Sequence, residues 1–234
     1  MNVNISKLIS RHATYRPDHL AVVFEDRRCT YQEFNRNVNR LANALVDLGI
    51  KKGDHIVTIL PNCLELIEIY WAVAKIGVVV VPLSTLLLGK GLKSLLVDAD
   101  TKTIITYYGF VPTLEEIRPS LKNIAPDRFL VTDARDLSDY QSYHALKERA
   151  SDLEPAEVEI NDNDPYNLIY SSGTTGAPKG IIHTHLIRSM YCALFASTFR
   201  MKPESVTLHT GSIIFNGAFV MLMPTFFMVK SWLS

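Results

Sequence analysis

The sequence contains few cysteines and carries no net charge. Its three cysteines, Cys29, Cys63 and Cys192, are widely spaced and form no CxxC pair, so neither a disulfide framework nor a zinc site is expected. Lysine plus arginine equals aspartate plus glutamate, at 24 each, so no overall field would recruit nucleic acid or an anionic membrane. These absences favour a globular protein of the reducing cytoplasm, in which any anion binding is local.

The sequence also lacks a long uninterrupted hydrophobic run. Charged and histidine side chains interrupt the first twenty residues, so a secretory signal is not expected. The most apolar stretch, 213–229, contains Asn216, Gly217, Pro224 and Thr225 and is marginal for the roughly 20 apolar residues of a spanning helix. We therefore expect a buried helix there rather than an integral membrane segment. The apolar share of 47% over 234 residues is ample for a core.

Glycine and hydroxyl side chains concentrate at residues 170–180, which read YSSGTTGAPKG. Backbone N–H groups and hydroxyls of such a segment can face an anion while a lysine lies beside them, so the pattern indicates a polyphosphate ligand. It is not a Walker loop, because Pro178 precedes Lys179 and Gly180 follows it. An ordinary surface turn between two strands is the alternative. The candidate nucleotide-binding residues are Ser171, Ser172, Gly173, Thr174, Thr175, Gly176, Ala177, Pro178 and Lys179.

Hydrophobic periodicity predicts alternating strands and helices along most of the chain. Strands are expected at 21–24, 28–31, 55–60, 78–81, 103–106, 128–131 and 206–209, and helices at 1–19, 30–48, 62–76, 92–97, 112–121, 140–149, 186–201 and 217–227. Thr30 and Glu33 have the spacing of a capping box, and Asn62 is a candidate cap for the helix that follows it. The rhythm predicts an α/β fold, with a largely parallel β-sheet flanked by helices, and a surface excursion at 133–165.

These motifs resemble those of the adenylate-forming superfamily, which includes AMP-dependent acyl-CoA synthetases. The loop is similar to the family signature YTSGTTGxPKG, with Ser171 in place of the usual threonine, and blocks at 30–34, 41–45, 52–54 and 60–62 follow in the family order. The resemblance implies that residues 1–234 are a partial N-terminal AMP-binding domain, with the phosphate loop at 170–180 and the C-terminal domain absent. A glycine is expected near Val229, so we interpret the last six or so residues as a foreign or frameshifted tail.

The resemblance implies an AMP-forming acid–thiol ligase that uses ATP, Mg²⁺ and CoA. The carboxylate of the acid attacks the α-phosphorus, pyrophosphate leaves, and the CoA thiol captures the acyl-adenylate. Thr174, Thr175, Gly176 and Lys179 are suited to neutralising the phosphates. No catalytic residue is assigned, and we expect the chain to be inactive alone. The alternatives are an adenylation domain that loads a carrier protein, and a non-catalytic fragment that binds a nucleotide or a partner. A homodimer is possible.

The acid pocket is predicted at Phe215, Asn216 and Gly217. In many relatives a histidine stands where Phe215 stands here, and a phenyl ring neither donates nor accepts a proton. The apolar residues that follow indicate a fatty, alicyclic or aryl acid, although a plain core helix is the commoner meaning of such a stripe. His183 and His185 are each expected to be an ordinary partly buried histidine rather than a ligand, and no metal site is predicted.

Overall fold

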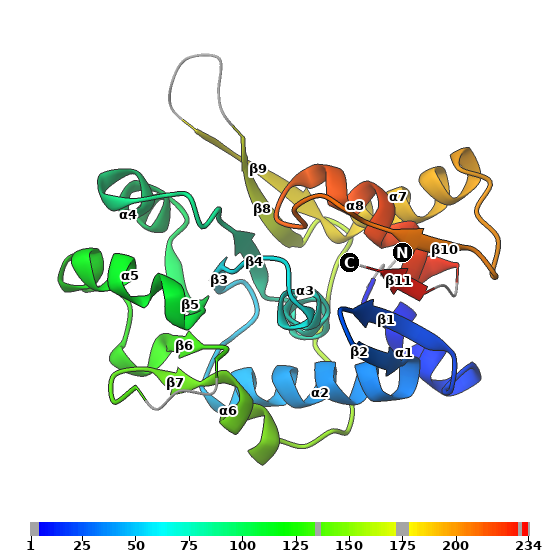
Figure 1. Ribbon diagram of the computed structural model, residues 1–234, viewed down its shortest axis with the longest axis horizontal. Helices are drawn as coiled ribbons and strands as arrows, with labels where there is room; N and C mark the ends of the chain where they lie inside the picture. Colours follow the sequence, from blue (N-terminus) through cyan, green and yellow to red (C-terminus); the bar gives the residue numbers. More distant parts are fainter. Residues whose placement is uncertain (1–4, 134–136, 172–177, 229–230, 234) are drawn as a thin grey trace.

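Two β-sheets and the helices around them form the fold (Figure 1). The computed structural model describes residues 5–133, 137–171, 178–228 and 231–233. The larger sheet has seven strands in the order β7-β6-β5-β3-β4-β8-β9, and the smaller has four in the order β10-β11-β1-β2. The large sheet consists of β3 (His55–Ile59), β4 (Val79–Pro82), β5 (Thr101–Thr106), β6 (Phe129–Val131), β7 (Gln141–Ser142), β8 (Pro165–Ser171) and β9 (Lys179–Thr184).

All neighbouring strands of the large sheet are parallel except β8 and β9, which form an antiparallel hairpin. Helices α2 (Tyr31–Asp47) and α3 (Leu64–Ile76) cover one face, and α4 (Gly89–Asp98) and α5 (Val111–Ile117) cover the other (Figure 1). Side chains along the strands alternate between the two resulting cores, as β-strand geometry requires. The predicted α/β fold with a largely parallel sheet is therefore confirmed.

The remaining elements surround these layers. They are α1 (Lys7–Tyr15), β1 (Leu20–Phe24), β2 (Arg27–Thr30), α6 (Tyr143–Arg149), α7 (His185–Thr198), β10 (Val206–Leu208), α8 (Asn216–Phe227) and β11 (Ser231–Leu233), with 3₁₀ turns at 108–110, 118–120 and 126–128. The strands predicted at 21–24 and 28–31 form the antiparallel pair β1–β2. Strand β11, in the predicted tail, pairs in parallel with both β1 and β10. Within the described ranges, no helix is both long and apolar enough to cross a membrane.

The predicted helix cap was confirmed for α2 and was wrong for α3. The Thr30 side chain accepts from the backbone N–H of Glu33, and the Glu33 carboxylate accepts from the backbone N–H of Thr30, so the predicted capping box is present. Asn62, by contrast, does not cap α3. Its Oδ1 accepts from the Ile213 N–H at 2.9 Å and its Nδ2 donates to the Gly211 carbonyl at 2.7 Å. Asn62 therefore ties the start of α3 to the segment before α8.

His183 and His185 lie in different elements, at the end of β9 and at the start of α7. Strand β9 ends at Thr184, whose hydroxyl accepts from the Ile187 N–H and caps α7, so His185 is the first residue of that helix. His183 and His185 are both buried, at 7% and 0% exposed. Helix α7 packs along α8 beside the hairpin (Figure 1).

Candidate functional site

The candidate site lies where strands β4 and β8 end. In open parallel sheets, ligands bind outside the carboxyl ends of the strands, because the loops that follow diverge there. Strand β4 ends at Pro82 and β8 at Ser171, and a cavity of about 190 Å³ lies at these ends. Its lining is mostly apolar and consists of Pro82, Leu83, Ser84, Leu87, Leu95, Tyr170, Ser171, Pro178, Ile214 and Phe215.

The hairpin places both ends of the predicted phosphate loop at this cavity. Ser171 pairs with Lys179 across the two strands, and Tyr170 pairs with Gly180. A Cβ at Gly180 would lie 2.8 Å from Leu168 Cδ1, so a larger residue there would have to displace that side chain. Residues 172–177 lie outside the described residues. The predicted roles of Ser172, Gly173, Thr174, Thr175, Gly176 and Ala177 therefore stay predictions.

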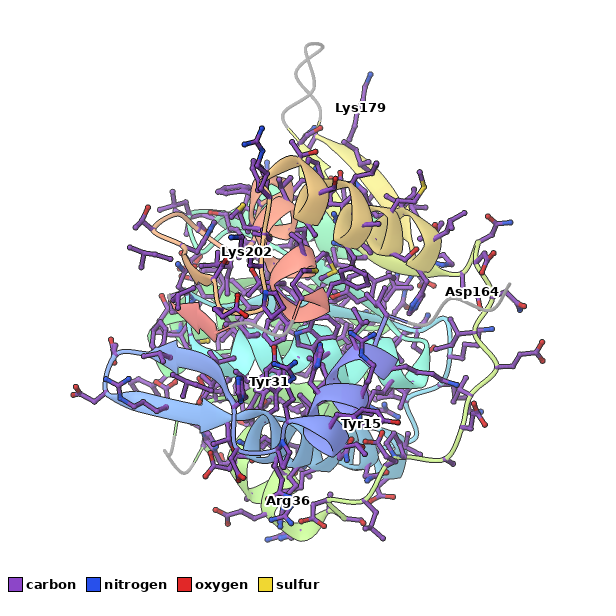
Figure 2. All side chains as sticks on the ribbon, turned by 90° about the vertical axis from the view of Figure 1, so that its right-hand side faces the viewer. Tyr15, Tyr31, Arg36, Asp164, Lys179 and Lys202 are labelled. Atoms are coloured by element: carbon purple, nitrogen blue, oxygen red, sulfur yellow. The ribbon has the colours of Figure 1, made fainter. Side chains whose placement is uncertain are left out.

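Lys179 is exposed at the end of the hairpin. Figure 2 shows its side chain pointing away from the body of the molecule. Its ammonium makes no hydrogen bond or ion pair with any residue that the structure describes. The charge is therefore not neutralised by a described carboxylate and is accessible to an anion from solution.

A short hydrogen bond holds the first strand of the hairpin against α4. The Tyr170 hydroxyl donates to Asp98 Oδ2 at 2.5 Å. Partial burial, together with the neighbouring Asp98 carboxylate, raises the pKa of Tyr170. The phenol therefore stays protonated and keeps donating at physiological pH. Because Tyr170 also lines the cavity, this bond fixes one of its walls.

The predicted acid-pocket residues occupy three different environments. Phe215 lines the cavity and is 54% exposed. Asn216 is half-buried, and its Oδ1 accepts a hydrogen bond from Arg188 Nη1 at 3.0 Å. Gly217 is exposed, and a Cβ there would meet no other atom within 4 Å. The structure thus brings Ser171, Pro178 and Phe215 around one cavity, with Asn216 just behind it.

Sequence reasoning missed Arg188, a fully buried guanidinium on α7. Its Nε and Nη2 donate to Asn167 Oδ1 at 3.2 and 3.1 Å, and its carbon Cζ lies 4.2 Å from the centre of the Phe219 ring. Burial lowers the pKa of Arg188 to about 10, so it remains charged at physiological pH. A lone arginine within the otherwise apolar helical pattern of 186–196 was the signal that could have found it.

The buried histidines are neutral at physiological pH. Burial lowers the pKa of both His183 and His185 to about 4. Within the described part of the chain, no three His, Cys, Asp or Glu side chains are grouped so that they could hold a metal ion.

The sequence model of one protein family, described as "AMP-binding enzyme", matches residues 9–230. The chain belongs to this family. It is 32% identical over 246 aligned residues to the long-chain-fatty-acid–CoA ligase FadD13 of Mycobacterium tuberculosis, covering 98% of this chain and 47% of that protein. It is 31% identical to the crotonobetaine/carnitine–CoA ligase of Salmonella agona, covering 72% of this chain and 34% of that protein. The chain thus spans about half the length of FadD13, and a smaller share of the Salmonella ligase is matched.

Solved structures agree with this family membership. The inhibitor-bound N-terminal domain of FACL13 from Mycobacterium tuberculosis matches with a TM-score of 0.85 at 28% identity, covering 99% of this chain and 56% of that one. The anthranilate CoA ligase AuaEII, in complex with anthranoyl-AMP, matches with a TM-score of 0.92 at 23% identity, covering 98% of this chain and 44% of that one. At that identity, the second match shows the fold alone.

Proposed function

We propose that this chain is the N-terminal part of an AMP-forming acid–CoA ligase that activates an apolar carboxylic acid with ATP. One observation carries the proposal. Lys179, which has no partner among the described residues, pairs across the hairpin with Ser171, and Ser171 lines an apolar cavity at the carboxyl end of β8. A cation and a hydroxyl suit a polyphosphate, and the cavity suits an acyl group, so the two halves of an acyl-adenylate would find matching surroundings. The relatives named as CoA ligases support the same reaction.

The described residues fit the phosphate part of this reaction. Two anions, the carboxylate and the triphosphate, repel each other, so the site must supply positive charge and hold the two in line. Lys179 would contact phosphate oxygens as a point charge, and Ser171 would donate from its hydroxyl. CoA would supply the thiol that accepts the acyl group. Mg²⁺ would arrive with the triphosphate. No described cluster of ligating side chains offers it a site, so we assign this chain phosphate binding only.

The cavity supports an apolar acid of modest width. Eight of its ten lining residues are hydrophobic, aromatic or proline, and Phe215 closes one side. We propose a fatty, alicyclic or aryl acid, with Phe215 shaping the pocket rather than transferring a proton.

We further propose that residues 1–234 form a partial AMP-binding domain, with the remainder of the nucleotide site in a longer protein, and that the chain alone turns over little. Coverage of 47% of FadD13 supports this arrangement. The three cysteines are free, which suits a cytoplasmic enzyme. A homodimer is a further proposal, and light scattering would test it.

Two measurements test the function. Pyrophosphate release should be observed from the longer protein with apolar acids and should be near background for residues 1–234 alone. Calorimetry with ATP should show weaker binding, by about ten-fold, in Lys179→Ala, because a charge-assisted contact is worth roughly 1.5–3 kcal/mol. Lys202→Ala is the matched control, since Lys202 lies elsewhere on the surface (Figure 2). Equal ATP binding by both variants would remove the phosphate role of Lys179.

A further inference from the structure

Arg188 is a buried cation whose neighbours are all uncharged. It is 0% exposed. Its hydrogen-bond acceptors are the amide oxygens of Asn167 and Asn216, and the Phe219 and Tyr191 rings lie against the guanidinium. The other groups that act on its charge or are influenced by it are Tyr166, Tyr70 and His183. Within the described ranges, no Asp or Glu forms an ion pair with Arg188.

Burying a guanidinium without a carboxylate partner is costly. Removing a guanidinium from water costs several kcal/mol, and amide oxygens return only part of that energy. Because the surrounding medium has a low dielectric constant and no described counter-ion cancels the charge, the positive potential of Arg188 extends into the adjoining space.

Arg188 is connected to the cavity at the ends of β4 and β8 through one residue, Asn216. Arg188 Nη1 holds Asn216 Oδ1 at 3.0 Å, and Asn216 directly follows Phe215, a cavity-lining residue. Asn216 is also the first residue of α8, so the partial positive charge of that helix terminus has the same sign in the same place. Two independent sources of positive potential therefore meet at Asn216, the residue that follows the cavity-lining Phe215.

We propose that Arg188 is a positioning residue for the acid substrate. Its charge offsets that of the carboxylate entering the cavity, and its bond to Asn216 fixes the wall that the carboxylate approaches. This inference rests on the proposed function and extends it, because it assigns the preference for a charged acid over a neutral molecule of the same shape to a buried arginine.

Asn167 offers a test in which stability and binding should change in opposite directions. Its Nδ2 has no hydrogen-bond partner among the described residues, while its Oδ1 accepts twice from Arg188. Asn167→Asp removes the unpaired donor and gives Arg188 a carboxylate on the side of β8. The melting temperature should stay equal or rise, and affinity for the acid should fall about ten-fold, since the charge is now neutralised.

The measurement uses the longer protein and the acid that gives the most pyrophosphate release, or hexanoate if none does. Affinities for this acid, for its neutral primary amide and for ATP are compared by calorimetry in the unchanged protein, Asn167→Asp, Arg188→Met and Arg188→Lys. The expected result is a loss of about ten-fold for the acid alone in the first two variants and partial recovery in Arg188→Lys. Thr225→Val, which removes a buried hydrogen bond between α8 and β10, is the uncharged control.

Two results would overturn the inference. One is an equal loss for acid, amide and ATP, or unchanged acid affinity in Asn167→Asp, either of which would mean that Arg188 only holds the helices together. The other is an unchanged protein that does not prefer the acid to its amide. Failure of the proposed function is a different result, namely no pyrophosphate release with any acid. In that case the comparison of acid, amide and ATP affinities still tests the role of Arg188.

Discussion

Gly180 is a residue at which the absence of a side chain shapes the site. A Cβ there would lie 2.8 Å from Leu168 Cδ1 and 3.3 Å from Tyr170 Cε1. Leu168 is 7% exposed and packed in the core between the sheet and α4, so it has little room to move. Tyr170 is in turn held by Asp98. The glycine therefore lets the cavity wall and the core pack against the same point of the hairpin.

We predict that Gly180→Ala lowers the free energy of unfolding by about 1 kcal/mol, the usual cost of forcing one extra carbon into a packed site. Thermal or urea unfolding measures it. Gly91→Ala is the matched control, because Gly91 lies inside α4 with nothing within 4 Å of the new Cβ, and that change should raise stability by about 0.5–1 kcal/mol. A Gly180→Ala variant as stable as the parent would show that the hairpin can widen freely.

Buried histidines make stability depend on pH. Burial lowers the pKa of His12 to about 4, and His12 Nε2 lies 2.8 Å from the Phe226 carbonyl, to which it donates when that nitrogen carries the proton. In the unfolded chain this histidine takes up a proton near pH 6.5, whereas in the folded chain it does so only near pH 4. The contribution of neutral His12 to the free energy of unfolding is therefore fully present above pH 6.5 and is lost as the pH falls from 6.5 to 4.

We predict that His12→Gln flattens the fall in unfolding free energy between pH 6.5 and 4 by about 2 kcal/mol, because the titrating group is gone. Urea titrations at half-unit pH steps measure the slope. His183 and His185 have similarly lowered pKa values and would keep part of the acid sensitivity in the variant. Identical slopes in variant and parent would contradict the burial of His12.

At the scale of elements, a buried ion pair joins α6 to α3. Lys147 Nζ lies 2.5 Å from Glu68 Oε2, and the Tyr143 hydroxyl donates to the same oxygen at 2.8 Å. Glu68 is 0% exposed and Lys147 is 8% exposed. Two charges desolvated in this way stabilise the contact only as long as both are present.

We predict that Lys147→Met destabilises the fold by about 3 kcal/mol, since it leaves the Glu68 carboxylate buried with only the Tyr143 hydroxyl. Adding Glu68→Met should return most of that loss, because two apolar side chains replace the pair. Chemical unfolding of Lys147→Met, of Glu68→Met and of the double variant gives the double-mutant cycle. Additive losses in the double variant would mean that the two residues do not interact energetically.

Elements whose signals are local were predicted from the sequence. The capping box at Thr30 depends on residues within one helical turn. Asn62 and Arg188 were misjudged or missed because their partners come from distant segments. Asn62 binds residues about 150 positions away along the chain. No pattern of spacing encodes such a contact, so the loop motif was visible in the sequence and its electrostatic setting was not.

At the scale of the whole molecule, residues 150–164 connect α6 to β8 without helix or strand. The sequence predicted this surface excursion from its composition but not what holds it in place. Amide groups of Asn35, Asn39 and Asn43 on α2 donate to the segment, and Lys75 of α3 forms an ion pair with its Glu154 at 2.6 Å. The helical layer on one face of the sheet therefore fixes the chain that leads into the hairpin.

Lys75 is the centre of this attachment. Its side chain is 3% exposed, and its ammonium also donates to Ser10 Oγ and to the amide oxygens of Asn35 and Asn39. Burial lowers the pKa of Lys75, although the neighbouring Glu154 carboxylate opposes that shift. Removing the ammonium leaves one carboxylate and two amide oxygens without their shared donor.

We predict that Lys75→Met loosens residues 150–164 before it affects the sheet. Amide hydrogen exchange in that segment should rise by at least about ten-fold, with a loss of about 3 kcal/mol in unfolding free energy, as expected for breaking a buried pair. Lys102→Met is the control, because the partner of Lys102 among the described residues is the exposed Asp100, two positions away. Uniform acceleration of exchange across both sheets would contradict a local role for Lys75, since the segment would then be no more dependent on it than the core.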